Sequence, residues 1–129
     1  MGYRVLTIKW ITRGCVRENR DRIFLFGDNL TQRGFGGQAA AMRGEPNVVG
    51  IPTKKLPSNS EDAFFTDAEF EQNKAAIDSA FERLSVKSST TDQVVVVPAD
   101  GIGTGRAQLK SRAPITFAYL QKRLEDLSL

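Results

Sequence analysis

The fold is decided by Val94–Gly105, which reads VVVVPADGIGTG. Four consecutive β-branched residues are typical of a central strand in a parallel sheet, buried on both faces. After Pro98 the loop carries glycine at every second position from Gly101 to Gly105. Because glycine adopts positive φ and lets other groups approach its backbone, such a loop can turn several N–H groups toward one anion. This stretch therefore predicts a buried strand followed by an anion-binding loop.

A second apolar run, also followed by a glycine-rich segment, lies earlier in the chain. Ile23–Phe26 reads IFLF, and Gly27–Gly37 reads GDNLTQRGFGG. Gly37–Arg43 then predicts a short helix whose amino end follows the glycines directly, an arrangement that can hold phosphate. In an open α/β sheet, loops at the carboxyl ends of parallel strands line the ligand crevice. Two such loops facing one crevice indicate a diphosphate or a nucleotide as the ligand.

The first half of the chain predicts two further strands and a short helix. Tyr3–Trp10 is apolar and β-prone, and Val48–Ile51 is a second such run that we expect Pro52 to end. Between them, Thr12 has the character of an N-cap residue and predicts a helix to about Asn19.

The second half predicts the two longest helices. Thr66–Glu69 reads TDAE, a capping box that opens a helix to about Leu84. Pro114 can open the last helix at its first position. The alternation of strands and helices predicts one α/β domain over residues 1–129, with helices on both faces of a mostly parallel sheet.

Composition narrows the possible chemistry. The chain has no histidine and one cysteine, Cys15. This argues against a zinc site and excludes a Ser-His-Asp or Cys-His nucleophile, so we expect no metal and no cofactor. No apolar run approaches the ~20 residues that span a bilayer. With no secretory segment and no internal disulfide, the sequence predicts a cytoplasmic protein.

The charge is placed unevenly along the chain. Residues 1–55 carry a net charge of +6 and residues 56–129 carry −3, which gives the overall +3. A basic half can attract nucleic acid or an acidic protein, and it can equally favour an anionic small molecule. The cations are scattered and follow no nucleic-acid-binding motif. A nucleic-acid or protein-interaction module stays an alternative to the small-ligand site.

Three motifs in order resemble macrodomains, the family of ADP-ribose-binding α/β domains. Gly27–Asn29 followed by Gly34–Ala39 resembles the first ligand loop of that family. Ile51–Lys55 (IPTKK) is similar to the strand-end Thr-Lys-Lys of the terminal ADP-ribose glycohydrolase subgroup, and Val97–Gly105 is similar to its second phosphate loop. The resemblance covers residues 21–125 and suggests a small phage or bacterial member.

The resemblance implies a three-layer, macrodomain-like sandwich that binds ADP-ribose or a related NAD-derived nucleotide, free or attached to a protein. In the subgroup, a lysine at the position of Lys54 attacks the anomeric carbon and releases ADP-ribose from an acidic side chain. The ligand-binding residues that follow from the resemblance and the loops are Asp28, Asn29, Gly34, Phe35, Gly36, Gly37, Gln38, Thr53, Gly101, Ile102, Gly103, Thr104, Gly105 and Arg106, and the candidate catalytic residues are Lys54 and Asp100. Gly36–Gln38 would face the ribose end, and Gly101–Gly105 would wrap the diphosphate.

The sequence departs from that subgroup at one position. Ala107 stands where the alignment expects an aspartate, and Asp28 and Asp100 are the nearest acids. Adjacent residues on a strand point to opposite faces, so Lys55 is not expected beside Lys54. Two functions therefore stay open: a lysine-dependent ADP-ribosyl hydrolase, and a module that sequesters a nucleotide or reads ADP-ribosylated proteins without chemistry.

Several of these residues also have a purely structural interpretation. The glycines can serve only to make turns, and Asp28 and Asn29 can cap a turn through side-chain hydrogen bonds. Asp100 can likewise cap the second loop, and Phe35 can pack beneath the first loop instead of stacking on a base or ribose.

Overall fold

The computed structural model describes residues 2–129 and contains one parallel four-stranded sheet. The strands stand in the order β1-β4-β2-β3 and comprise β1 (Arg4–Ile8), β2 (Arg22–Asn29), β3 (Val48–Lys54) and β4 (Val94–Pro98). As the valine run predicts, β4 is a central strand, paired with β1 on one side and β2 on the other. Val95 and Val96 are fully buried there.

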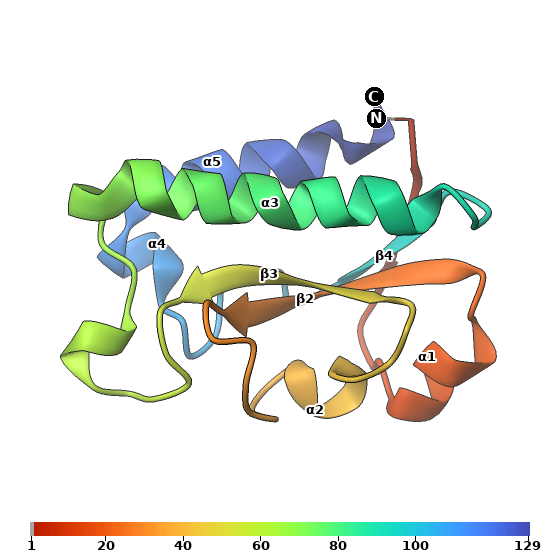
Figure 1. Ribbon diagram of the computed structural model, residues 1–129, viewed down its shortest axis with the longest axis horizontal. Helices are drawn as coiled ribbons and strands as arrows, with labels where there is room; N and C mark the ends of the chain where they lie inside the picture. Colours follow the sequence, from red (N-terminus) through yellow and green to blue (C-terminus); the bar gives the residue numbers. More distant parts are fainter. Residues whose placement is uncertain (1) are drawn as a thin grey trace.

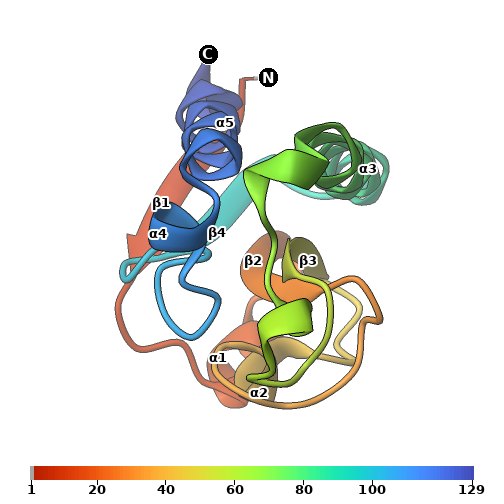
Figure 2. The same ribbon diagram turned by 90° about the vertical axis from the view of Figure 1, so that its left-hand side faces the viewer.

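Helices cover both faces of the sheet (Figures 1 and 2). α3 (Phe70–Ser88) and α5 (Pro114–Glu125) lie over one face, and α1 (Arg13–Glu18) and α2 (Ala39–Met42) lie over the other. The short α4 (Leu109–Arg112) leads into α5, and three 3-10 turns complete the chain: η1 (Glu61–Ala63), η2 (Asp67–Glu69) and η3 (Asp126–Ser128). The α/β class and the parallel sheet are thus as predicted.

Strand β2 contributes side chains to two hydrophobic clusters, one on each face of the sheet. Leu25 packs with the residues of α3 and α5, whereas Phe24 and Phe26 pack with those of α1 and α2. All of these side chains are almost completely buried. Alternation along the strand sends consecutive side chains to opposite faces, so a continuous apolar run is what this central position requires.

Both strands that lead to the candidate site are longer than the sequence predicts. β2 continues through Gly27 to Asn29, because these residues pair with the end of β3. β3 passes through Pro52 and ends at Lys54. A proline that was expected to end the strand is accommodated because β3 is an edge strand, where a missing N–H leaves no ladder partner unsatisfied.

The predicted helix starts are partly wrong. Thr12 caps α1 as expected, accepting the Cys15 N–H. The Thr66 side chain caps no N–H group, and the α-helix begins only at Phe70 after the η2 turn. Asp67 instead accepts hydrogen bonds from the backbone N–H groups of Ile115 and Thr116, so it caps α5, which Pro114 opens at its first turn.

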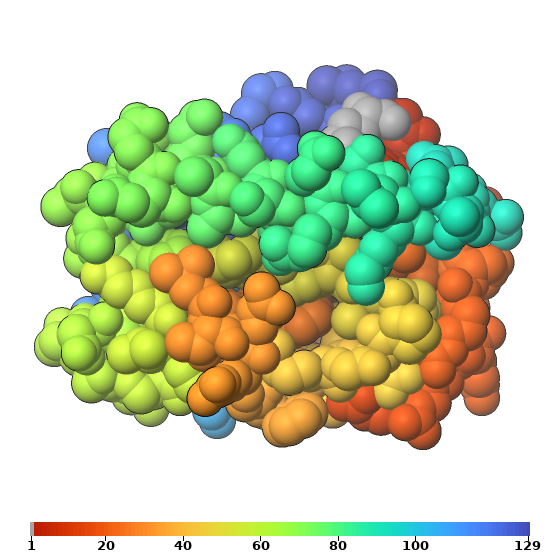
Figure 3. Space-filling model, viewed as in Figure 1, coloured from red at the N-terminus to blue at the C-terminus, as the bar shows by residue number. Residues whose placement is uncertain are grey.

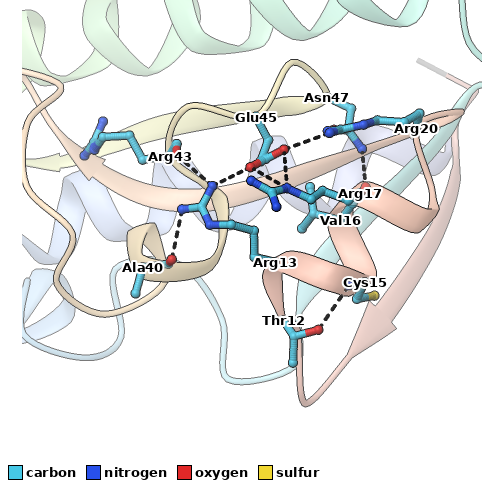
Figure 4. A network of polar contacts seen from close by, with 10 residues as sticks. All are labelled: Thr12, Arg13, Cys15, Val16, Arg17, Arg20, Ala40, Arg43, Glu45 and Asn47. Carbon is cyan, nitrogen blue, oxygen red and sulfur yellow. Dashed lines mark hydrogen bonds and ion pairs between the residues drawn. The ribbon is translucent and has the colours of Figure 1, made fainter.

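A buried carboxylate ties α1 to the turn before β3 (Figure 4). Glu45 accepts hydrogen bonds from Arg13, Arg17 and Arg20, and Arg13 also donates to the Ala40 carbonyl next to it. Hydrogen bonds, above all from Arg13, lower the pKa of Glu45 from 4.5 to about 2. This network holds α1 and α2 together beneath the sheet.

We expect the Glu45 network to make stability depend on acid pH. The pKa of Glu45 in the folded protein lies below 4.5, the ordinary value of a glutamate carboxyl and the one expected in the unfolded chain. The stabilisation is therefore fully present above pH 4.5 and is lost as the pH falls toward about 2. Glu45→Gln should lower the melting temperature near neutral pH. In this variant the melting temperature should also fall less steeply than in the wild type as the pH is lowered. Glu18→Gln, on the exposed side of α1, is the matched control. An equally steep fall of the melting temperature at acid pH in the wild type and in Glu45→Gln would contradict the role given to Glu45.

Candidate functional site

The two glycine-rich loops meet at the carboxyl ends of neighbouring strands, β2 and β4. From β2 the chain turns toward α2 on one face of the sheet, whereas from β4 it turns toward α5 on the other (Figure 2). Divergence of the chain at adjacent strands opens a crevice, which is where open α/β sheets bind ligands. The predicted meeting of the two loops is therefore a consequence of the strand order.

A cavity of about 340 Å³ lies between the loops. This volume falls within the range of small-molecule sites. The end of β3 and the following loop close one side, with Lys54, Pro57 and Asn59 among the lining residues. Figure 3 shows the first glycine loop (orange) on the surface beside the yellow-green segment that follows β3, and Gly34 lies against Pro57 there.

Most of the predicted site residues line this cavity. They are Asp28, Asn29, Gly34, Phe35, Gly36, Gly37, Gln38, Thr53, Lys54, Gly101, Gly103, Thr104, Gly105 and Arg106. Two predicted residues do not. Ile102 is fully buried in the hydrophobic core, and Asp100 lies at a neighbouring cavity of about 240 Å³ beside Lys9. Ala107, at the position where an acid was expected, does line the main cavity.

Gln38 joins the two loops. Its Oε1 accepts the Gly27 N–H at 2.8 Å, and its Nε2 donates to the Gly101 carbonyl at 2.8 Å. Both polar ends of the side chain are thus engaged with the backbone. The sequence predicts that Gln38 faces a ribose, whereas the structure places its amide as a bridge between the carboxyl ends of β2 and β4.

Asp28 and Asn29 organise the first loop. The Asp28 carboxylate is buried and forms an ion pair with Arg43, which also donates to the Gly34 carbonyl at 2.6 Å. Asn29 accepts the Thr31 N–H at 3.0 Å and donates to the Arg33 carbonyl at 2.8 Å. Asn29 thus caps the turn that follows it, whereas the Asp28 carboxylate is engaged by Arg43 and by the Asn29 N–H.

Backbone N–H groups are available in both loops. Within residues 2–129, the N–H groups of residues 33–38 and 102–107 have no acceptor. The predicted phosphate site at the amino end of α2 is different, because the N–H groups of Ala39, Ala40 and Ala41 donate to carbonyls of the preceding turn. Since α2 has only four residues, its dipole is small, and the loops themselves carry the anion-binding potential.

Cations dominate the cavity. Arg33, Arg43, Lys54 and Arg106 line it, and Asp28 is the acid among the lining residues. Only Arg43 forms an ion pair with that acid; the side chains of Arg33 and Arg106 have no hydrogen-bonding or ion-pair partner within the described chain. Such uncompensated positive charge favours an anionic ligand.

Lys54 has an unusual environment for a lysine at the end of a strand. Its Nζ donates to the Ser58 carbonyl and lies 4.7 Å from the centre of the Phe64 ring. Burial, followed by the charges of Arg106 and Arg112, lowers its pKa. The neighbouring Lys55 forms an ion pair with Glu69.

Sequence reasoning missed several residues of the site. Arg43 was assigned only to the predicted helix, and Arg33 was not singled out within the first glycine loop. Pro57 and Asn59 lie in a segment that gave no motif. An arginine that follows a glycine loop by one helical turn is a usable signal for Arg43. Arg33 is indicated by its place in the first glycine loop, whereas for Pro57 and Asn59 the sequence offers no signal.

The described residues include no group of three or more His, Cys, Asp or Glu side chains that could hold a metal ion. Among residues 2–129, no helix combines the length and the apolar character that crossing a bilayer requires.

Fold and site together define a parallel α/β domain with a cationic cavity at the carboxyl edge of its sheet. Residues 6–123 match a family of unknown function, DUF7831, and the chain belongs to this family. No curated protein and no solved structure matches the chain.

Proposed function

We propose that the cavity binds ADP-ribose or a related NAD-derived nucleotide, with the diphosphate held between the two glycine loops. The observation that carries this proposal is the combination of unpaired loop N–H groups with unpaired cations around one cavity. N–H groups and guanidinium groups are the usual protein ligands of diphosphates. Phe35 is 65% exposed at the cavity wall, which makes its ring available for stacking on a base or ribose.

The proposal includes a small macrodomain-like sandwich as the architecture. Helices on both faces of a parallel sheet support it, as does the order of the motifs along the chain. The cavity also brings together the first loop, Lys54 and the second loop, the three parts on which the resemblance rests.

We favour binding without hydrolysis, which makes the protein a module that sequesters a nucleotide or reads ADP-ribosylated proteins. Among the described lining residues, Asp28 is the one carboxylate, and it is paired with Arg43. Asp100 lies at the neighbouring cavity, and Ala107 supplies no acid. The lowered pKa of Lys54 favours the second candidate, a lysine-dependent hydrolase.

Thermal-shift binding tests the proposal with ADP-ribose, NAD, AMP and cyclic ADP-ribose. A ligand at ~100 times its dissociation constant adds about 2.7 kcal/mol to the free energy of unfolding, which raises Tm by several degrees. We expect such a shift with ADP-ribose and intact nucleotide by chromatography afterwards. Release of nicotinamide from NAD, or conversion of cyclic ADP-ribose to ADP-ribose, would favour the hydrolase, and no shift with any nucleotide would contradict the proposal.

A cavity-filling variant and a matched control variant test whether the ligand binds in this cavity. Gly105 lines the cavity, has no positive φ, and has open space where a Cβ would lie. We therefore expect Gly105→Leu to fold normally and to lose the ADP-ribose shift. Gly14→Leu, on the exposed face of α1, should retain the full shift. Equal shifts in both variants would place the ligand outside this cavity.

A further inference from the structure

We propose that the outer edge of β1 is the surface through which two copies of this chain pair, in antiparallel orientation, to form one continuous sheet. β1 and β3 are the two edge strands and lie at opposite margins of the sheet (Figure 2). The chain covers the edge of β3 and leaves the edge of β1 open. An open edge presents N–H and C=O groups to any strand that can supply the complementary groups.

The edge of β3 is covered by other parts of the same chain. Arg83 of α3 donates to the Gly50 carbonyl at 3.0 Å. Pro52 presents no N–H group, and Lys54 forms an antiparallel bridge with Phe64 in the segment that follows the strand. Cations over an edge, a proline and a covering loop are known means of preventing a strand from pairing with another chain. A second strand could therefore not add to β3 without displacing these groups.

The edge of β1 has no such cover. The Ile8 carbonyl accepts the Ala99 N–H at 2.9 Å, so the peptide groups of Ile8 face β4. Because every second residue of a parallel strand faces the same neighbour, Val5 and Thr7 direct their N–H and C=O groups away from β4. Within residues 2–129, no group forms a hydrogen bond with the backbone of Val5 or Thr7 on that side.

The open edge is as long as β1 itself. At its amino end, Tyr3 donates to the Leu127 carbonyl at 2.8 Å, so η3 covers the edge there. At its carboxyl end, β1 stops at Ile8 and the chain turns toward α1. The strand contains no proline, and its pairing with β4 shows no β-bulge. A second strand can therefore pair with Arg4–Ile8 over the full length of β1.

Pairing of β1 with a second β1 over this length defines one register. Leu6 lies opposite the partner's Leu6 at the two-fold axis, and Val5 lies opposite the partner's Thr7. Since Val5 and Thr7 both direct their peptide groups outward, each such pair can exchange both N–H···O bonds. A shift by one residue would set outward-facing groups against inward-facing ones and lose these bonds.

The side chains favour a second copy of the chain as the partner. Val5 is half-buried on the face of α5, and Leu6 and Ile8 are half-buried on the face of α1, so a continued sheet would cover apolar surface on both faces. Arg4 falls opposite the partner's Ile8, and thus no like charges face each other. Lys9 falls toward the carboxyl end of the partner's α5, where the helix dipole is negative.

Sedimentation of the full chain from micromolar to millimolar concentration tests the proposal. We expect a monomer–dimer equilibrium, weak because the interface is small. Thr7→Pro removes an outward N–H without removing a bond to β4, so it should raise the dissociation constant of the dimer about tenfold or more. Thr7→Val keeps the N–H and the branched side chain and should retain the dimer. A wild type that is monomeric at millimolar concentration, or a dimer that Thr7→Pro leaves intact, would overturn the proposal.

Disulfide cross-linking tests the register and does not depend on the folding of Thr7→Pro. In a Cys15→Ala background, Leu6→Cys should link two protomers under mild oxidation, because the Cα atoms of a non-hydrogen-bonded antiparallel pair lie about 4.5 Å apart. Thr7→Cys is the control: it is more exposed, but its counterpart lies two residues away along the partner strand, beyond the reach of about 7 Å. Cross-linking of Thr7→Cys alone, or of neither variant, would overturn this pairing of β1.

Discussion

Replacing Gly103 with alanine is expected to lower the free energy of unfolding by about 2–5 kcal/mol. Gly103 has φ +81°, a conformation that costs an L-residue about 1–2 kcal/mol. A Cβ there would lie 3.0 Å from Leu109 Cδ2 and 3.3 Å from Thr53 Cγ2, and both neighbours are buried. Overpacking of a buried site costs a further 1–3 kcal/mol, about as much as the backbone strain.

Gly105→Ala is the control for this prediction, and chemical denaturation is the measurement. Gly105 belongs to the same loop, but it has no positive φ and no atom within 4 Å of its expected Cβ. We expect Gly105→Ala to change the free energy of unfolding by less than about 0.5 kcal/mol. Similar losses in both variants would mean that glycine is required throughout the loop for another reason.

The strands that carry the site could be predicted because their signals are local. Four consecutive valines are compatible with a central parallel strand, and the structure places β4 there. The glycine loops could be placed together because the carboxyl ends of parallel strands share one edge of a sheet. The extension of β3 through Pro52 could not, since edge position depends on the strand order of the whole sheet.

The roles of individual side chains depend on partners far away in the sequence. Gln38 reaches Gly101, and Asp67 caps a helix that begins at Pro114, and no local pattern announces either contact. In the second loop, Asp100 lines a second cavity and Ile102 packs in the hydrophobic core, although their neighbours in the loop line the main cavity. A glycine-rich loop has no regular periodicity from which these directions could be derived.

The structure also accounts for the basic half of the chain. Arg13, Arg17 and Arg20 converge on Glu45, and Arg43 pairs with Asp28. Much of the positive charge is thus used in ion pairs that fix α1 and the first glycine loop. The nucleic-acid alternative stays a prediction that salt-dependent binding to DNA or RNA would test.

Replacing Gln38 with leucine is expected to weaken ADP-ribose binding about tenfold or more and to lower the free energy of unfolding by about 1–3 kcal/mol. The variant keeps the approximate size of the side chain but leaves the Gly27 N–H and the Gly101 carbonyl without their partner. A partly buried polar group that loses its partner costs about 1–3 kcal/mol, reduced here by access of water. We expect ADP-ribose binding to be affected more strongly than stability, because the two loops lose the contact that sets their separation.

Calorimetry well below the melting temperature separates this positioning role from a loss of folded protein. Gln38→Glu is informative because it keeps the acceptor for Gly27 but turns a carboxylate oxygen toward the Gly101 carbonyl, so it should weaken binding as well. Gln72→Leu, on the exposed side of α3, removes an amide far from the cavity and should change nothing. Wild-type affinity in Gln38→Leu would show that the two loops keep their separation without the bridge, and the anion site would then depend on the loop backbones and the cations that line the cavity.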